Sequence, residues 1–514
     1  MAIHLVLLIF IGVLCFLYYF LFKNHNYWKI RNVPYVKPLP LFGNYKEFLL
    51  LQKHMSVIVQ KMCQQFPGEP YFGSFYGTSP ALIIQDPNLL KLVMAKDFYY
   101  FSGREMSDHT TKEKLNKHLF LAHGDKWKVL RTNLSPLFSS SKLKNTFVSI
   151  SNFSDTLESL LAKEVKKGSS FDVKNFLSRY TIDCITEFAF GISSDTMKQD
   201  VSRNPFKKMG DKVFDTSDDK ILRTICRTMW PGLFYALGFK LFEDDMYTFF
   251  DNLMTEVFQQ RKETNTSKSD FVDRLAKWKI DNYITGESLI TAITGDKENV
   301  SINVDNELLV AQCFMMFAAG FATTATSLSF LLYELAKDKI VQEKVIQEVD
   351  EYFAKHKNIA YDCTYTMRYT ASCLDESLRL YPVLGVITRE VIHEYTLPTS
   401  LCLKRGDRIH IPVYHIHHNP DYFPEPEVFR PERFFGDEKK NIMPYTYMPF
   451  GEGRRMCLGM RFAKMVIFAS LMKIFKNYRV ELADNMPRKI TVNPKSIIIQ
   501  PVGGIHVNFI SRED

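Results

Sequence analysis

The stretch Phe450-Gly451-Glu452-Gly453-Arg454-Arg455-Met456-Cys457-Leu458-Gly459 decides the fold of this 514-residue chain. A lone cysteine, Cys457, stands among glycines and just ahead of an apolar helical stretch, residues 460–468. Backbone N–H groups at a helix N-terminus stabilise a thiolate and lower the pKa of the thiol. The pattern therefore predicts a cysteine held as a thiolate, which serves as a metal ligand or as a nucleophile.

Four kinds of site contain such a cysteine. A buried free cysteine is usually an inert small hydrophobe. A zinc site needs a second Cys or His at close spacing, and none accompanies Cys457. A cysteine nucleophile needs a histidine base, which no neighbouring pattern supplies. The fourth kind is haem iron with an axial thiolate, which favours O–O bond cleavage.

The decapeptide resembles the haem-binding signature of the cytochrome P450 family. Every fixed position of Phe-x-x-Gly-x-Arg-x-Cys-x-Gly matches, from Phe450 to Gly459. The resemblance implies a mainly α fold with small β-sheets, the cytochrome P450 fold. Haem b would lie between a long distal helix and the proximal helix after the cysteine loop. Cys457 would be the metal ligand, with Phe450 and Arg455 beside the cofactor.

Composition agrees with a chain that has a large core and stays in a reducing compartment. Hydrophobic residues make up 46% of the chain, and nine scattered cysteines argue against a disulfide framework and for a reducing compartment. The formal net charge of +8 is typical of a solvated surface and would also suit an acidic partner or an anionic membrane.

The N-terminus predicts a membrane anchor. Residues 2–22 contain one strongly polar side chain, His4, and are long enough to span a bilayer. A secretory signal peptide, the alternative, would begin with basic residues, whereas here the basic residues follow the run. We predict a transmembrane anchor at 1–22, a basic and proline-rich linker at 23–44 that acts as a semi-rigid spacer, and a haem-thiolate monooxygenase domain at 45–514. The resemblance implies the endoplasmic reticulum membrane, with the catalytic domain facing the cytosol.

Further segments predict the layout of the body. Residues 71–76 and 81–85 indicate strands around a turn, residues 86–385 are mainly helical, and 408–414 and 496–509 are strand-rich. The apolar run 308–332 is a core helix or a second membrane span; its glutamine and threonines favour the core. The aromatic stretch 230–254 is equally typical of core and of a lip that dips into a membrane.

The motif Ala319-Gly320-Phe321-Ala322-Thr323-Thr324 lies in that apolar run. The resemblance implies that it crosses the distal face of the haem, where Gly320 and Ala319 let O₂ and substrate approach and Thr323 helps to deliver protons. A hydroxyl both donates and accepts, although a helical threonine often bonds to a carbonyl one turn earlier. Most family members have an acid where this chain has Ala322, which puts the efficiency of proton delivery in doubt.

Glu376 and Arg379 stand three residues apart and would share one helix face. With Arg433 in the downstream Pro-Glu-Arg-Phe segment, they resemble the Glu-Arg-Arg network that holds the cysteine loop in the family. Trp127 and Arg131 lie four apart on another helix, and the resemblance implies that they bind the haem propionates together with Arg389 and Arg455. Arg104 and His410 are weaker candidates. The same comparison predicts a substrate pocket formed by Ala318, Leu384, Val386, Ile387 and Val502.

The resemblance implies a monooxygenase that inserts one oxygen atom of O₂ into apolar small molecules. No nicotinamide or flavin fingerprint is visible, so NADPH electrons would arrive through the flavins of NADPH–cytochrome P450 reductase, with cytochrome b5 as a second candidate partner. Segments 381–389, 445–453 and 459–463 resemble insect microsomal enzymes that oxidise plant toxins and insecticides. A haem-thiolate isomerase or dehydratase that needs no external electrons, and a non-enzymatic haem sensor, are the alternatives. No nucleic-acid partner is expected.

Overall fold

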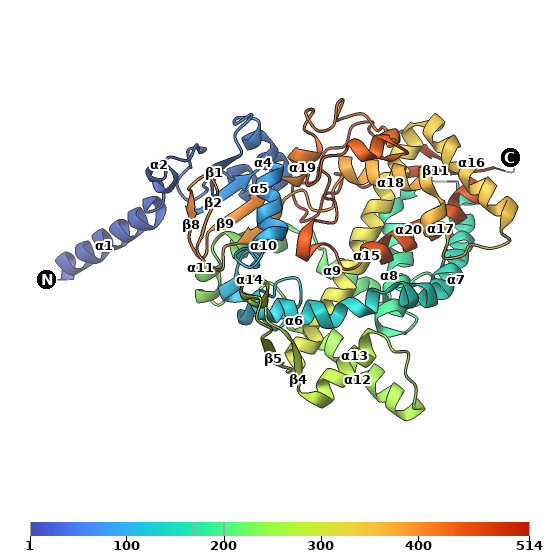
Figure 1. Ribbon diagram of the computed structural model, residues 1–514, viewed down its shortest axis with the longest axis horizontal. Coiled ribbons are helices and arrows are strands. Elements are labelled where there is room, and N and C mark those ends of the chain that lie inside the picture. The colour runs from blue at the N-terminus through green and yellow to red at the C-terminus, as the bar shows by residue number, and fades with distance from the viewer. Residues whose placement is uncertain (1, 169, 199–200, 513–514) are drawn as a thin grey trace.

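A long helix, α15 (Asn306–Lys337), runs through the centre of the molecule in the computed structural model, which describes residues 2–168, 170–198 and 201–512 (Figure 1). Asp305 caps its N-terminus by accepting from the backbone N–H of Leu308 at 2.6 Å. The helix packs against α8 (Val173–Phe190), α18 (Arg368–Leu380) and α20 (Met460–Asn477). Most of its side chains are buried, so the apolar run 308–332 is a core helix.

The fold is mainly α-helical around this core, as predicted. Short turns of helix include η3 (Lys114–Asn116), η5 (Pro431–Phe434) and η7 (Gly453–Arg455). The other helices are α1 (Ala2–Phe22), α2 (Tyr27–Ile30), α3 (Lys46–Leu49), α4 (Met55–Cys63), α5 (Pro87–Lys91), α6 (Gly124–Leu134), α7 (Ser140–Val165), α9 (Pro205–Val213), α10 (Asp218–Met229), α11 (Pro231–Ala236), α12 (Asp244–Thr264), α13 (Phe271–Asp281), α14 (Thr291–Thr294), α16 (Lys339–Lys355), α17 (Cys363–Thr366) and α19 (Val413–His417).

A four-stranded sheet lies at one side of the molecule, in the order β1-β2-β9-β6. It contains β1 (Tyr71–Tyr76), β2 (Ser79–Ile84), β6 (Ile387–Glu390) and β9 (Arg408–Ile411). β1 and β2 are antiparallel, with Tyr71 opposite Ile84, and β9 runs parallel to β2. A three-stranded sheet has β11 (His506–Ser511) between β10 (Tyr478–Leu482) and β3 (Phe171–Asp172). Two further sheets pair β4 (Tyr283–Glu287) with β5 (Asn299–Asn303) and β7 (Tyr395–Thr396) with β8 (Cys402–Leu403).

Two predicted strand regions are shorter in the structure than in the sequence analysis. β9 ends at Ile411, because Pro412 has no N–H to donate and α19 begins at Val413. Within 496–509 only the end is strand, from His506 onward. Gly503 and Gly504 have φ values of +79° and +81° and form a turn before it.

The N-terminal helix α1 projects from the body (Figure 1), and its residues Ile3–Phe22 are apolar and long enough to cross a membrane. Met1, the first residue of the predicted anchor, and residues 513–514 of the predicted domain lie outside the described residues. The first part of the predicted linker packs against the four-stranded sheet. Trp28 is 1% exposed, and its Nε1 donates to Ser74 O at 2.9 Å. Gly73 is glycine because a Cβ there would overlap the Trp28 ring.

The stretch 230–254 divides between its two predicted roles. In and just after α11, Leu233, Leu237 and Phe239 are exposed apolar side chains. In α12, Met246 and Phe250 are fully buried. The first half is therefore an apolar surface, and the second half belongs to the core.

Candidate functional site

Cys457 lies in a tight loop directly before α20. Its backbone N–H donates to Phe450 O at 2.8 Å, which closes the loop. Gly453 has a φ of +68°, and a Cβ there would overlap the backbone oxygen of Met94. Only glycine fits that position, so the loop is folded against the segment around Met94.

The Cys457 thiol does not have the lowered pKa that the sequence predicts. Its side chain keeps accessible surface on one side, but protein atoms enclose it on the others. Burial raises the pKa of the thiol, although the N–H groups of Gly459 and Met460 and the charge of Arg131 act in the opposite direction. Desolvation therefore outweighs the helix N-terminus. A bound metal ion deprotonates such a thiol outright.

Four guanidinium groups gather around this cysteine: Arg104, Arg131, Arg389 and Arg455. Burial and the positive charges of the other three hold the pKa of Arg455 well below its usual value. Burial lowers the pKa of Arg104 to about 9 and that of Arg389 to about 10. The buried Nε atoms of Arg104 and Arg389 have no hydrogen-bond partner among the described residues. Buried cations with unused donors require an anion, and the two propionates of haem b would supply it.

Arg455, a predicted propionate ligand, donates to backbone oxygens of a neighbouring segment. Its Nε donates to Ser102 O at 3.0 Å, and its Nη atoms donate to the backbone oxygens of Phe120 and Ala122. Its guanidinium lies 4.9 Å from the ring centroid of buried Trp127. Arg455 thus ties the cysteine loop to the chain that leads into α6.

The other predicted cofactor residues border the same region. Arg131 lies on α6. Burial lowers the pKa of its guanidinium, and the opposing effect of Cys457 is smaller. Phe450 is half-buried at the start of the loop, with Lys464 Nζ 5.9 Å from its ring centroid. His410, a weaker candidate, is bonded elsewhere: its Nε2 lies 2.7 Å from Glu105 Oε1, and its Nδ1 lies 2.9 Å from the Tyr45 hydroxyl.

The middle of α15 has one accessible face within an otherwise buried helix. Ala318, Ala319, Gly320 and Thr323 keep accessible surface, whereas Phe321 and Ala322 are buried. Ala319 and Thr323 are one turn apart and share a face. Thr323 Oγ1 donates to Ala319 O at 2.7 Å, which occupies its proton and leaves its lone pairs free to accept.

Gly320 has a packing role that the sequence did not reveal. A Cβ at this position would overlap the side chain of Ile185 on α8. The glycine therefore allows α8 and α15 to pack closely.

The predicted substrate residues differ in their exposure to solvent. Leu384 and Val386 are half-buried, and Ile387 is buried with its Cδ1 3.8 Å from where a Cβ of Gly451 would lie, beside the cysteine loop. Val502, by contrast, is 54% exposed in a surface turn.

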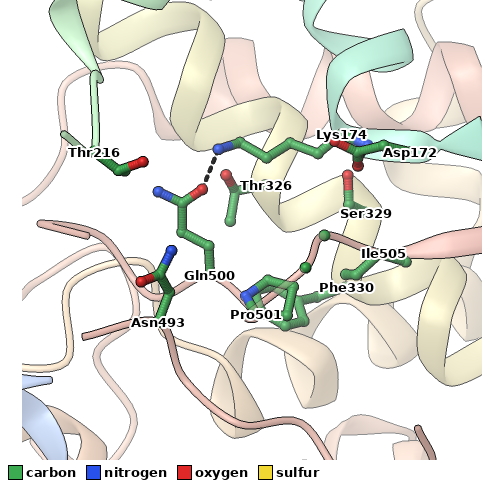
Figure 2. A pocket seen from close by; sticks show the side chains of 12 residues that line it. Asp172, Lys174, Thr216, Thr326, Ser329, Phe330, Asn493, Gln500, Pro501 and Ile505 are labelled. Carbon is green, nitrogen blue, oxygen red and sulfur yellow. Dashed lines mark hydrogen bonds between the residues drawn. The ribbon is translucent and has the colours of Figure 1, made fainter. Parts of the chain in front are cut away.

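Pro501 and Gly503, on either side of Val502, line a cavity of about 170 Å³ with both polar and apolar walls (Figure 2). Lys174 donates to Gln500 at its edge, and the buried hydroxyl of Thr326 has no partner among the described residues.

Glu376, Arg379 and Arg433 lie together in a buried network. Arg379 Nε and Nη2 donate to the two carboxylate oxygens of Glu376 at 2.7 and 2.8 Å, and both side chains are fully buried. Arg433 Nε lies 3.4 Å from Glu376 Oε1, and the backbone N–H of Arg430 donates to the same oxygen at 2.9 Å. The fork of Arg379 matches the carboxylate. The contacts that Arg430 and Arg433 make with Glu376 fix α18 relative to η5.

His417, which no motif in the sequence predicts, joins this network to the segment that leads into the cysteine loop. Its Nδ1 donates to Arg379 O at 3.2 Å, and its Nε2 accepts from the backbone N–H of Met448 at 2.9 Å. Arg379 Nη1 donates to His417 O at 2.8 Å. Burial lowers the pKa of His417 far enough to keep the ring neutral, as this pair of bonds requires. The only signal in the sequence is the cluster of histidines at 415, 417 and 418.

Comparison with known proteins decides the family. The family model of cytochrome P450 matches residues 33–508. The chain belongs to the cytochrome P450 family. It is a P450 monooxygenase, and the family implies haem iron with an axial cysteine thiolate, small-molecule substrates and electron-donating partners.

The relatives are insect P450 enzymes that match the chain nearly end to end. Cytochrome P450 6B2 of Helicoverpa armigera is 33% identical over 500 residues, which cover 97% of this chain and 96% of the relative. Cytochrome P450 6j1 of Blattella germanica is 30% identical over 506 residues, covering 98% and 97%. Cytochrome P450 6A1 of Musca domestica is 31% identical over 507 residues, covering 97% and 96%.

Proposed function

We propose that this P450 inserts one oxygen atom of O₂ into apolar xenobiotics such as plant toxins or insecticides, with Cys457 as the axial ligand of haem b. The observation that carries the proposal is the position of Cys457 directly before α20 amid four guanidinium groups, two of which, Arg104 and Arg389, have a buried Nε without a hydrogen-bond partner among the described residues. Haem supplies the chemistry of oxygen activation. The insect relatives support the substrate class.

The side chains of this P450 would bind and orient the cofactor. Arg104 and Arg389 offer unpaired Nε–H donors to the propionates, and Arg131 and Trp127 border the same region from α6. The guanidinium forks suit carboxylates because two parallel N–H donors fix both distance and direction.

Thr323 would hold a water molecule through its free lone pairs at the accessible face of α15. Its hydroxyl proton is bound to Ala319 O, so the hydroxyl accepts from the water and fixes the water's position. Ala322 is 2% exposed and provides no acid at this step. Protons would therefore reach the reaction through water rather than from a carboxylate next to the threonine.

Electrons would come from NADPH through a flavoprotein reductase, with cytochrome b5 as a second donor. The basic side chains Lys126, Lys128, Arg454 and Lys464 lie on or next to the elements around the cysteine loop, and an acidic partner would be attracted to them. The helix α1 would anchor the enzyme in the endoplasmic reticulum membrane, with residues 1–22 as the anchor and residues 45–514 facing the cytosol.

The test is reconstitution with an insect reductase and NADPH across a panel of apolar plant compounds and insecticides. We expect product that appears only with reductase, NADPH and O₂. Product formed without NADPH would instead indicate an isomerase or dehydratase, and substrate binding without any product would indicate a sensor. Cys457→His should abolish the red-shifted Soret band of the reduced CO complex, because that band reports a thiolate opposite CO. A variant that kept the band would exclude Cys457 as the ligand.

A further inference from the structure

A β-hairpin covers the outer face of α6, the helix that borders the cofactor site with its inner face. Its strands β4 and β5 pair in register, with Tyr283 opposite Asn303 and Glu287 opposite Asn299. Figure 1 shows both strands beside α6. The inner face of α6 presents buried Trp127 to Arg455. The hairpin and the cofactor site therefore lie on opposite faces of one helix.

Specific contacts fix the hairpin on α6. Gly286 passes so close that a Cβ would lie 3.2 Å from Val129. Asn133 Nδ2 donates to Thr285 O at 3.0 Å. At the tip of β4, the backbone N–H of Leu289 donates to Asp125 Oδ1 at 2.6 Å, and Ser288 Oγ donates to the same oxygen at 3.0 Å.

One of these contacts occupies a basic side chain of α6. Glu287 Oε2 lies 3.3 Å from Lys128 Nζ, and the two side chains are 42% and 25% exposed. Lys128 directly follows Trp127, so its charge lies at the edge of the helix that carries the cofactor residues. An exposed ion pair of this kind is weak and exchanges readily for another acidic partner.

We infer that the hairpin β4–β5 is part of the docking surface for the acidic electron donor, and that Glu287 competes with that donor for Lys128. The inference rests on the proposed function, because it needs an electron-donating protein with an acidic face. Docking would break the Lys128–Glu287 pair and replace it with a contact to the donor. Glu287 would also repel the donor's carboxylates, so the hairpin would set the strength of docking.

The test measures binding of the full-length, haem-loaded protein to a purified flavoprotein NADPH reductase by titration at low and high salt. Glu287→Gln should lower the dissociation constant about two- to fivefold at low salt, which is the range that an exposed ion pair allows. The gain should shrink as salt is raised, because exposed charges are screened. Glu298→Gln is the control: it removes the same charge at the loop end of the same hairpin, next to Asn299, the strand partner of Glu287, and Glu298 is exposed and makes no ion pair among the described residues.

A second pair of variants tests whether the effect passes through Lys128. Lys128→Gln alone should weaken binding, and Glu287→Gln should gain less in that background than in the wild type. An equal gain in both backgrounds, or an equal gain from Glu298→Gln, would overturn the inference in favour of general charge repulsion. If the wild type binds reductase and Glu287→Gln changes nothing, the inference fails while the proposed function stands. If the wild type does not bind reductase at all, the proposed electron source fails and the inference fails with it.

Discussion

At the scale of single residues, the Glu376–Arg379 pair shows how a short motif acquires a structural role. Both side chains are completely buried, and a buried ion pair is tolerable only where hydrogen bonds replace the lost water. Here each carboxylate oxygen and each Arg379 nitrogen named above has a partner, and His417 carries the connection on to Met448. The pair therefore fixes, through His417, the position of the segment before the cysteine loop.

Arg379→Lys should destabilise the protein although it keeps the charge. Lysine cannot reproduce the fork to Glu376 together with the bond to His417 O, so the carboxylate is left partly unsatisfied. Breaking a buried pair costs on the order of 3–5 kcal/mol. Denaturant unfolding and the haem content of the purified protein measure the effect.

Arg430→Lys is the matched control. Arg430 reaches Glu376 through its backbone N–H, while its side chain makes a partly exposed pair with Glu438. The loss should stay below about 1 kcal/mol. Equal losses from the two substitutions would show that the guanidinium fork of Arg379 has no special role.

At the scale of elements, α15 combines a buried scaffold with one accessible face. The apolar run 308–332 predicts this helix well, because its length and polar positions are local properties of the sequence. The reason for Gly320 is not local: its partner Ile185 lies on α8, far away in the chain. The strand predicted over 496–509 is shorter in the structure, because the turn that contains Gly503 and Gly504 interrupts it before His506.

Some residue roles around the cofactor site follow from local spacing in the sequence, and others follow only from the fold. The loop 450–459 and the pair 376/379 have fixed spacings, so the sequence predicts where they lie. His417 and the backbone partners of Arg455 depend on segments brought together by the fold, and no spacing predicts them. The exposure of Val502 likewise follows from the turn and not from its residue type.

Thr323→Val tests the role assigned to the accessible face of α15. Valine keeps the branched shape but removes the hydroxyl that would hold water, so electrons should pass to peroxide instead of product. Product formed per NADPH consumed should fall at least about tenfold, in line with the usual contribution of a positioned proton-transfer group. Thr324→Val is the control, because Thr324 is buried and donates to Gly320 O at 2.8 Å. An unchanged ratio in Thr323→Val would make Thr323 a packing residue.

At the scale of the whole molecule, buried histidines make the fold sensitive to acid. Burial lowers the pKa of His54, His415 and His418 to about 4 and that of His118 to about 3, and it holds His417 lower than usual as well. The unfolded chain binds protons near pH 6.5 and the folded protein does not, so stability is full above pH 6.5 and falls as the pH decreases below it. Glu390 acts in the opposite direction, because burial raises its pKa to about 7.

His118→Phe should flatten this pH dependence. The ring of His118 lies 6.1 Å from that of Phe314, and its buried Nδ1 has no partner among the described residues, so a phenyl ring should be accommodated. Between pH 6.5 and pH 5 the wild type should lose about 2 kcal/mol more than the variant. Denaturant unfolding at the two pH values measures the difference, and parallel losses would mean that His118 is already protonated in the folded protein.

The segment after α1 and the segment before α11 contact one turn of the four-stranded sheet. Gly77 and Thr78 join β1 to β2; Asn24, just after α1, donates to Thr78 O at 2.8 Å. On the same turn, a Cβ at Gly77 would lie 2.8 Å from Nε1 of Trp230, the residue before α11. The residues just after α1 and just before α11 therefore contact the same turn.

Deleting residues 2–22 should weaken membrane binding without removing it. Leu233, Leu237 and Phe239 remain exposed beside the anchor's end and offer a second apolar contact. Sedimentation with phospholipid vesicles should show partial binding of the truncated protein, which Leu233→Gln with Leu237→Gln abolishes. Val148→Gln is the control, because Val148 is 66% exposed on α7, at the other end of the molecule from α1 in Figure 1. Haem content must be unchanged throughout, since loss of haem on truncation would make residues 2–22 part of the core. Equal release by the Val148 variant would show that exposed apolar side chains act wherever they lie, and the surface of α11 would then have no special role in membrane contact.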